Sequence, residues 1–173
     1  EGLMKLKTRL CIAWFLLTTC FTVAAGCAPV ISREALQSAD RSLPFPTLAA
    51  DPGAFSGTTV ILGGQIVETK NLPGKSLIFV VQRPLDSRQK PKPDSESRGR
   101  FLISVEGFLD PAIYRAGRWI TVVGTVAGSE TRPLGDIQYT YPVIAEREHH
   151  LWPVKGVAPD AQIHFGIGIG FGF

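Results

Sequence analysis

The fold is decided by the stretch Trp119-Ile120-Thr121-Val122-Val123-Gly124-Thr125-Val126-Ala127. It is rich in β-branched residues, which favour a pleated strand, and no charged residue interrupts it. Gly117 before it and Gly128 after it are natural breakers. An uncharged run with these borders is typical of a strand buried in a sheet. We therefore predict a strand over 119–127.

Further segments on both sides of this run have strand character. Val60–Glu68 contains Gly63 and Gly64, and glycine inside a strand marks a bulge or a tight bend. Asn71-Leu72-Pro73-Gly74 is a turn signal and predicts a hairpin with the next strand. Pro142 lacks an amide donor and predicts that the last strand lies at an edge. The predicted strands are Val60–Glu68, Ser76–Arg83, Arg100–Glu106, Trp119–Ala127 and Ile137–Ile144, with a loop over Gly128–Gly135.

One short helix is predicted between the third and fourth strands. Asp110 is a favourable N-cap, and Pro111 suits the first helical position. Short strands with a helix at this point are typical of a small Greek-key barrel of OB type. We therefore predict an all-β fold over residues 58–153, a five-to-six-stranded OB-like barrel with one short helix.

Residues 1–26 have the pattern of a secretory signal. Met4 is the expected initiator, and a short positive segment precedes the uncharged run Leu10–Val23. That run is shorter than the roughly 20 apolar residues of a transmembrane helix. Ala24-Ala25-Gly26-Cys27 follows, with small residues directly before a cysteine. This resembles the bacterial lipobox, in which cleavage follows Gly26 and Cys27 carries the lipid, although Ala24 replaces the usual larger aliphatic residue.

Composition limits the function of the chain that remains after cleavage. Three of the 18 Lys and Arg residues and one of the 15 Asp and Glu residues lie in the signal, leaving a net charge of +1. Such a balance gives no argument for nucleic-acid binding. Cys11 and Cys20 leave with the signal, so we expect no disulfide and no cysteine metal site. Ala28, in place of an aspartate after Cys27, predicts sorting to the outer membrane.

Residues 27–57 are predicted to form a tether between the anchor and the barrel. Pro44 and Pro46 favour extended backbone, and Asp51-Pro52-Gly53 is a turn signal. An N-terminal arm packed on the domain explains this segment equally well, and both interpretations stay open. A chain from about Ala49 to Pro153 is expected to fold without its anchor and without disulfides.

A long polar loop is predicted between the second and third strands. Pro84–Gly99 has almost no apolar residues and carries a slight excess of positive charge. Loops of this length are functional or simply mobile. A basic loop could contact anionic head groups, although a solvated loop explains the same composition.

Residues 154–173 form an unusual C-terminal tail. His164–Phe173 alternates large apolar residues with glycine, so a strand here would place every large side chain on one face. One strand alone cannot cross a bilayer, because its backbone edges would stay unsatisfied. Phe165–Phe173 could therefore pair with another copy or with an outer-membrane barrel protein. A peripheral tail is the alternative.

Candidates for catalysis and metal binding are few. His149 and His150 are adjacent, so on a strand they face opposite sides, a poor start for one metal site even with Glu146, Glu148 and Asp160 nearby. Turn and cap roles explain Asp86 and Asp110 better than a pair of catalytic carboxylates. Stacking of bases on Trp119, Phe79 and Phe101 is less expected than packing in the core. We expect no enzymatic activity, no metal, no cofactor and no nucleic-acid partner.

Several motifs occur in an order that resembles the Slp family of starvation-inducible outer-membrane lipoproteins. They are Gly63-Gly64-x-Ile66, Arg83-Pro84-Leu85-Asp86, Gly99-Arg100-Phe101, Gly107-Phe108-Leu109-Asp110-Pro111, Tyr114-x-x-Gly117-Arg118-x-x-Thr121-Val122-x-Gly124, Tyr139-x-Tyr141-Pro142 and Leu151-Trp152. Leu62 departs from the aromatic residue expected before the paired glycines. The resemblance implies a lipid-anchored protein of the outer membrane and no known activity. We expect a structural or envelope-stress role, facing the periplasm. The alternative is a periplasmic module that binds an envelope glycan, lipid or small ligand on the barrel face.

Overall fold

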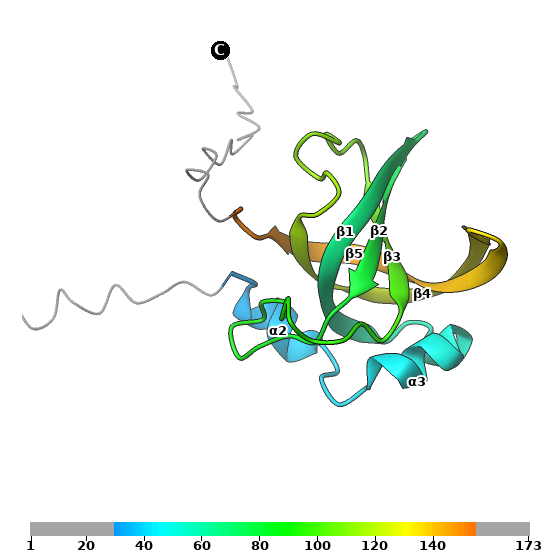
Figure 1. Ribbon diagram of the computed structural model, residues 1–173. Coiled ribbons are helices and arrows are strands. Elements are labelled where there is room, and N and C mark those ends of the chain that lie inside the picture. Colours follow the sequence, from blue (N-terminus) through cyan, green and yellow to red (C-terminus); the bar gives the residue numbers. More distant parts are fainter. Residues whose placement is uncertain (1–29, 155–173) are drawn as a thin grey trace, which may run out of the picture.

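The computed structural model describes residues 30–154 and contains a closed five-stranded barrel (Figure 1). The strands are β1 (Thr59–Leu72), β2 (Lys75–Gln82), β3 (Arg100–Glu106), β4 (Trp119–Leu134) and β5 (Ile137–Leu151). Their order around the barrel is β1-β2-β3-β5-β4, and β4 pairs with β1 to close it. The predicted all-β, OB-like barrel is confirmed.

Closure depends on one parallel seam. β5 pairs with β3 in parallel over Leu102–Val143, Ile103–Ile144 and Ser104–Ala145, while all other neighbouring strands are antiparallel. Because β5 lies between β3 and β4, the prediction that it is an edge strand is wrong. Pro142 lies one residue before the seam, where β5 is paired with β4 alone. The missing amide is therefore tolerated at a locally free edge.

The paired glycines lie where β1 changes partners. Gly64 is aligned with Gln82 of β2 and with Ile120 of β4. A Cβ on Gly64 would lie 2.0 Å from the carbonyl oxygen of Val81, so only glycine permits this approach of the backbones. A bulge follows between Ile66 and Glu68. The predicted irregularity in this strand is thus present as a bulge just after the glycines, and the glycines themselves allow the close approach of the neighbouring strand.

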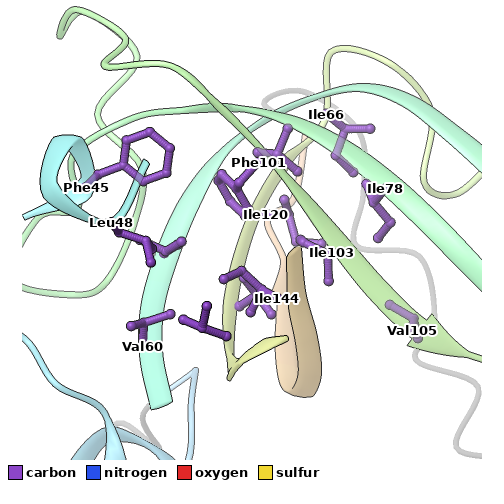
Figure 2. Packing of buried hydrophobic residues seen from close by; sticks show 14 residues of the cluster. Phe45, Leu48, Val60, Ile66, Ile78, Phe101, Ile103, Val105, Ile120 and Ile144 are labelled. Atoms are coloured by element: carbon purple, nitrogen blue, oxygen red, sulfur yellow. The ribbon is translucent and has the colours of Figure 1, made fainter. Parts of the chain in front are cut away.

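The barrel interior is filled by aliphatic and aromatic side chains from every strand (Figure 2). Ile78, Phe101, Ile103, Ile120 and Ile144 have no exposed surface. They alternate along their strands with outward-facing residues, as the period of two requires. A second cluster lies apart from it, formed by Leu77, Phe79, Leu102 and Tyr141.

β4 and β5 continue past the barrel as a long hairpin (Figure 1). The predicted loop over 128–135 is wrong, because residues 128–134 belong to β4 and the chain turns at Gly135 and Asp136. Burial alternates strictly along this part of β4, and its outward residues are polar. A strand whose solvent-facing side carries Ser129, Thr131 and Pro133 has the composition of a loop, which explains the error.

The N-terminal segment is packed on the barrel and contains α2 (Arg33–Ser38), α3 (Phe45–Ala50) and the 3-10 helix η2 (Pro52–Phe55). Phe45 and Leu48 of α3 belong to the barrel core, and Figure 2 shows both beside it. Ile31 is completely buried against Ala39 and Val123. From Ile31 onward the chain therefore adopts the packed arm, one of the two interpretations left open, and the tether does not extend over these residues.

The predicted helix after the third strand is absent from its expected place in the described chain. Residues 111–114 form a single turn, in which the Asp110 carboxylate accepts from the amide of Ala112 at 2.8 Å. Asp110 thus keeps the predicted capping role without a helix. α3 instead covers the opposite end of the barrel, where β1 and β3 begin (Figure 1). Within residues 30–154, no helix is long and apolar enough to cross a membrane.

Candidate functional site

The predicted lipidation and sorting residues lie outside the described residues. Gly26, Cys27 and Ala28 precede Val30, the first described position, and the tail segment Phe165–Phe173 follows the last one, Val154. The structure instead describes the point at which the chain meets the barrel.

That point is fixed by apolar and polar contacts together. Ile31 has no exposed surface, and the next residue, Ser32, makes two hydrogen bonds to Glu148 of β5. The Ser32 amide donates to one carboxylate oxygen at 2.7 Å, and the Ser32 hydroxyl donates to the other at 2.6 Å. The hydroxyl also caps α2 by accepting from the amide of Ala35. The first described residues are thus bound to the last strand of the barrel.

A pocket of about 270 Å³ lies at the C-terminal end of β5, a few residues beyond Glu148. Its walls include Trp119 at the start of β4 and Trp152 just after β5. Both indole side chains are partly exposed, and neither belongs to a buried core cluster. The expectation that Trp119 is a core residue is therefore wrong. Phe101 is buried in the barrel and Phe79 on its outer side, so Trp119, Phe79 and Phe101 do not form one surface.

The Trp152 ring is held in place by a chain of hydrogen bonds. Its indole Nε1 donates to Thr121 Oγ1 at 2.9 Å, and Thr121 Oγ1 donates to the carbonyl of Gln89 at 2.7 Å. Thr121 is completely buried. His150 packs edge-on against the same ring, with the centroids 4.6 Å apart. The ring is therefore preorganised by the barrel and by the loop that follows β2.

The 84–99 loop is itself ordered by a tight turn. Asp86 Oδ1 accepts from the amides of Arg88 and Lys90, and the Asp86 amide donates to the Lys90 carbonyl. Gln89 inside this turn has φ +65°, the one positive φ of a non-glycine among the described residues. Backbone in this region is strained for such a residue and is often found at functional sites. The turn presents Lys90, whose Nζ lies 5.4 Å from the centroid of the Trp152 ring.

The charged side chains of this pocket are both cationic. Lys90 and Arg118 line it, and none of its lining residues is a carboxylate. The Arg118 guanidinium donates to the carbonyls of Ile113 and Trp152, while its Nε is buried without a partner among the described residues. The pocket thus combines two indoles with two positive charges, of which Arg118 is held by hydrogen bonds.

A second pocket, of about 330 Å³, lies between the N-terminal segment and the loop after β2. Asp40, Arg41, Arg83 and Asp86 are among its lining residues, so its charges have both signs. Several of these groups already have partners. Asp40 accepts from the amide and the hydroxyl of Ser42, which lowers its pKa, and Arg83 donates to the Ser95 carbonyl. Arg83 Nε, like Arg118 Nε, is buried without a partner among the described residues. This pocket differs from the tryptophan pocket in its mixed charges and in having no tryptophan in its lining.

A hydrogen-bonded series of three residues joins the loop after β3 to β5. Tyr114 Oη lies 2.8 Å from His149 Nε2, and His149 Nδ1 lies 2.9 Å from Glu146 Oε1. The order resembles that of nucleophile, base and acid in hydrolases, but burial and then the Glu146 charge raise the pKa of Tyr114, which opposes its activation. These residues line neither pocket described above. The series holds the loop against the barrel.

The weak metal site considered from the sequence is not assembled in the described part of the chain. His149 and His150 do face opposite ways, since His149 contacts Glu146 and His150 packs on Trp152. Glu148 binds Ser32 instead. Among residues 30–154, no three His, Cys, Asp or Glu side chains are grouped closely enough to hold a metal ion, and Asp160 lies outside them.

The carboxylates Asp86 and Asp110 remain apart in turn and cap roles. The ion pairs among the described residues join Lys70 to Glu68, Arg132 to Glu130 and His149 to Glu146, so neither aspartate takes part in one. Sequence reasoning missed the pairing of Lys90 with Trp152. The positive charge of the loop was a signal for it, but the partner across the barrel could not be read from the sequence.

Comparison with known proteins gives a consistent result. The model of the outer membrane lipoprotein Slp family matches residues 24–166. The uncharacterized lipoprotein YeaY of Escherichia coli is 34% identical over 58% of this chain and 52% of its own length. A Haemophilus influenzae protein is 38% identical over 56% of this chain and 53% of its own. The outer membrane protein Slp of Escherichia coli is 27% identical over 65% and 60%.

The matched segments span only part of the curated relatives, between about half and three fifths of their length. Among solved structures, a Plasmodium falciparum SSB complex with ssDNA is 18% identical and covers 54% of this chain and 91% of that one. Its TM-score of 0.29 is too low to carry an argument. The family model covers most of the chain, including every motif that carries the resemblance, and the chain therefore belongs to the outer membrane lipoprotein Slp family.

Proposed function

We propose that this outer membrane lipoprotein is anchored through lipidated Cys27 and has a structural role in envelope integrity or stress tolerance, without catalysis. In this proposal cleavage follows Gly26, Ala28 permits outer-membrane sorting, and the barrel faces the periplasm. Within the Tyr114–His149–Glu146 series, the raised pKa of the tyrosine argues against its use as a nucleophile.

The observation that carries this proposal is the short link between the anchor and the fold. Residues 28–30 separate Cys27 from the buried Ile31. A fully extended chain covers at most about 3.6 Å per residue, so the step from Cys27 to Ile31 spans no more than about 14 Å. A barrel held this closely has one side fixed toward the lipid surface, which suits a structural protein of the membrane face. The domain limits then become a signal over 1–26, a packed domain from Ile31, and a tail over 154–173.

A depth measurement tests this arrangement. If Cys27 is acylated, the mature chain has no other cysteine, so single cysteines can be introduced and spin-labelled directly. We expect a label on Arg33→Cys, in exposed α2, to be relaxed strongly by a lipid-bound paramagnetic agent. Ile137→Cys at the β4–β5 turn is the control, because Figure 1 shows the start of the described chain and that turn on opposite sides of the barrel. Equal relaxation at the two positions would contradict the close link.

Anchoring itself is tested separately. Mass spectrometry of the mature N-terminus should find an acylated Cys27, and density-gradient fractionation should recover the protein with the outer membrane. Ala28→Asp should move it toward the inner membrane. In a deletion strain sensitive to detergent, we expect the wild-type chain to restore growth and Cys27→Ala to fail. Full rescue by Cys27→Ala would show that the anchor is not needed for the role.

The tail is the proposed contact with another protein. Deleting Phe165–Phe173 should leave fractionation unchanged, since the acyl chains already anchor the protein. It should remove a crosslink to a second copy or to an outer-membrane barrel protein. A crosslink that is the same in the truncated and full-length chains would assign no assembly role to the tail.

A second candidate function is a periplasmic binding module for an envelope glycan, lipid or small ligand. The tryptophan pocket favours it, because aromatic walls with a few fixed polar groups are the usual features of ligand sites. A binding role and a structural role are compatible in one anchored domain.

A further inference from the structure

We propose that the tryptophan pocket binds an anionic sugar, a pyranose ring that carries a phosphate or a carboxylate. The inference rests on the second candidate function and names its ligand class and its site. The residues that carry it are Trp119, Trp152, Lys90 and Arg118.

The two indoles provide the surface for the sugar ring. The apolar C–H face of a pyranose packs well on the negative face of an aromatic ring, and large rigid rings lose little entropy on binding. Trp152 is already fixed through Thr121, so binding does not have to order it. The backbone joins the two tryptophans directly, because the Trp152 amide donates to the Trp119 carbonyl at 2.8 Å. Their relative position is thus set by the barrel.

The two cations provide the selectivity for charge. A pocket with Lys90 and Arg118 and no lining carboxylate favours an anion over a neutral or cationic ligand. His150 beside Trp152 adds no charge near neutral pH, because burial and then the neighbouring His149 lower its pKa. A pocket lined only by aromatic rings would bind many apolar molecules, whereas the two cationic side chains select molecules that also carry an anionic group.

The position of the pocket is suited to a ligand at the envelope surface. Trp152 follows Glu148 along the same strand end, and Glu148 binds Ser32 near the start of the described chain. Figure 1 shows the end of β5 and the start of the described chain on the same side of the barrel. The pocket therefore lies on the side that the close link directs toward lipid.

Tryptophan fluorescence gives a direct readout. Of the three tryptophans in the chain, Trp14 leaves with the predicted signal, so Trp119 and Trp152 report the pocket alone. Mature lipoprotein in mild detergent is titrated with N-acetylglucosamine 1-phosphate and with glucuronic acid, and we expect saturable quenching by at least one of them. Neutral N-acetylglucosamine and inorganic phosphate are the controls and should bind at least tenfold more weakly. Equal binding of either control, or no saturable change with both anionic sugars, would overturn the proposal.

Matched variants separate the site from the fold. Lys90→Ala should weaken binding about tenfold, the loss of one charge-assisted contact. Lys92→Ala removes the same charge from an exposed position of the same loop and should leave binding unchanged. Trp119→Ala should abolish binding, while Trp119→Phe keeps an aromatic ring and should retain much of it. Equal effects of Lys90→Ala and Lys92→Ala would reduce the interaction to general electrostatics and contradict the site.

Two further measurements identify the source of the sugar and test whether the chain's own C-terminal residues occupy the pocket. Tighter binding to vesicles that contain a phosphorylated glycolipid than to the free sugar phosphate would assign the site to a lipid head group, and the reverse to a soluble glycan; either supports the proposal. A chain ending at Val154 should bind like the full chain. If that truncation alone shifts tryptophan emission as the sugar does, the pocket belongs to the chain's own C-terminal residues and the proposal fails. Fractionation is independent of these measurements, so loss of binding would leave the anchoring proposal intact.

Discussion

Two regions outside the strands, residues 31–57 and residues 84–99, are attached to the barrel in different ways. The first contributes Ile31, Phe45 and Leu48, which are 0%, 5% and 1% exposed. The second contributes Pro91 as its one buried residue, and is held by the Asp86 turn and by the bond from Thr121 to the Gln89 carbonyl. One region is thus part of the hydrophobic core, and the other is positioned by polar contacts.

The difference shows which property separates an arm from a loop. Both segments are rich in proline and have no clear periodicity, so local pattern does not distinguish them. What differs is the supply of large apolar side chains, because burial of such side chains stabilises by about 1.5–3 kcal/mol each. A loop without them gains order from hydrogen bonds of about 1 kcal/mol each and can open without unfolding the barrel.

Removing residues 30–48 should have the largest effect on this comparison. A chain from Ala49 to Val154 lacks Ile31, Phe45 and Leu48, so one end of the barrel core is exposed to water. The sequence predicted that such a chain folds, but because these side chains belong to the core we now expect it to lose cooperative thermal unfolding by circular dichroism. A chain from Val30 to Val154 should unfold in one transition. Equal melting temperatures would return residues 30–48 to the role of a tether.

A single substitution in the arm should have the next largest effect. Leu48→Ala is expected to lower the free energy of unfolding by about 2–5 kcal/mol, through lost burial and the cavity that remains. Thr47→Ala, at the exposed neighbouring position, is the control and should change it by less than about 0.5 kcal/mol. Urea denaturation measures both. A cost below about 1 kcal/mol for Leu48→Ala would mean that the arm is only loosely attached.

The corresponding change in the loop should cost less and act locally. Asp86→Ala removes the acceptor of the Arg88 and Lys90 amides, and we expect a loss of about 1 kcal/mol or less in global stability. Hydrogen exchange of these two amides should rise by at least tenfold, while the amides of β2 stay protected. Ser87→Ala in the same turn should change neither quantity. If Asp86→Ala lowers the free energy of unfolding as much as Leu48→Ala does, both regions contribute to global stability in the same way and the contrast between them fails.

The smallest effect concerns pH. The pKa of His150 is lowered from 6.5 by burial and then by His149, so the folded state favours the neutral ring. Its contribution to stability is complete above pH 6.5 and decreases as the pH falls toward the lowered value. The arm should not respond there, because the pKa of its Asp40 is lowered from 3.8 and its contribution decreases only below that value. Backbone amide NMR signals near Thr121 and Gln89 should shift between pH 7 and 5, and His150→Gln should remove these shifts. If the shifts are instead centred on α2, the arm and not the His150 region responds in this pH range, and the prediction is wrong.

The sequence was sufficient for the elements that depend on local composition. The strand beginning at Trp119 followed from its β-branched residues, and the irregularity of β1 next to Gly63 and Gly64 followed from glycine. The OB-like barrel followed from the number and spacing of these elements. Family membership followed from motifs spread along the chain.

Features that depend on contacts between distant residues could not be obtained in this way. The helix next to the core lies before β1 and not after β3, because Phe45 and Leu48 find the core only in three dimensions. The outer part of β4 resembles a loop, since its outward residues are polar. The pocket required both Lys90 and Trp152, which belong to different segments and have no common motif.

The bond between Ser32 and Glu148 also affects the order in which the protein can assemble. Its partners are 116 residues apart, and Glu148 belongs to the last strand. Contacts between such distant residues form late and slowly, since the intervening chain must first be ordered. If Cys27 is the lipid anchor, as proposed, the chain between the anchor and the barrel is packed only after β5 has formed. Under that proposal, folding itself would bring the barrel to the bilayer, and the time of barrel closure would set when the protein reaches its final distance from the lipid.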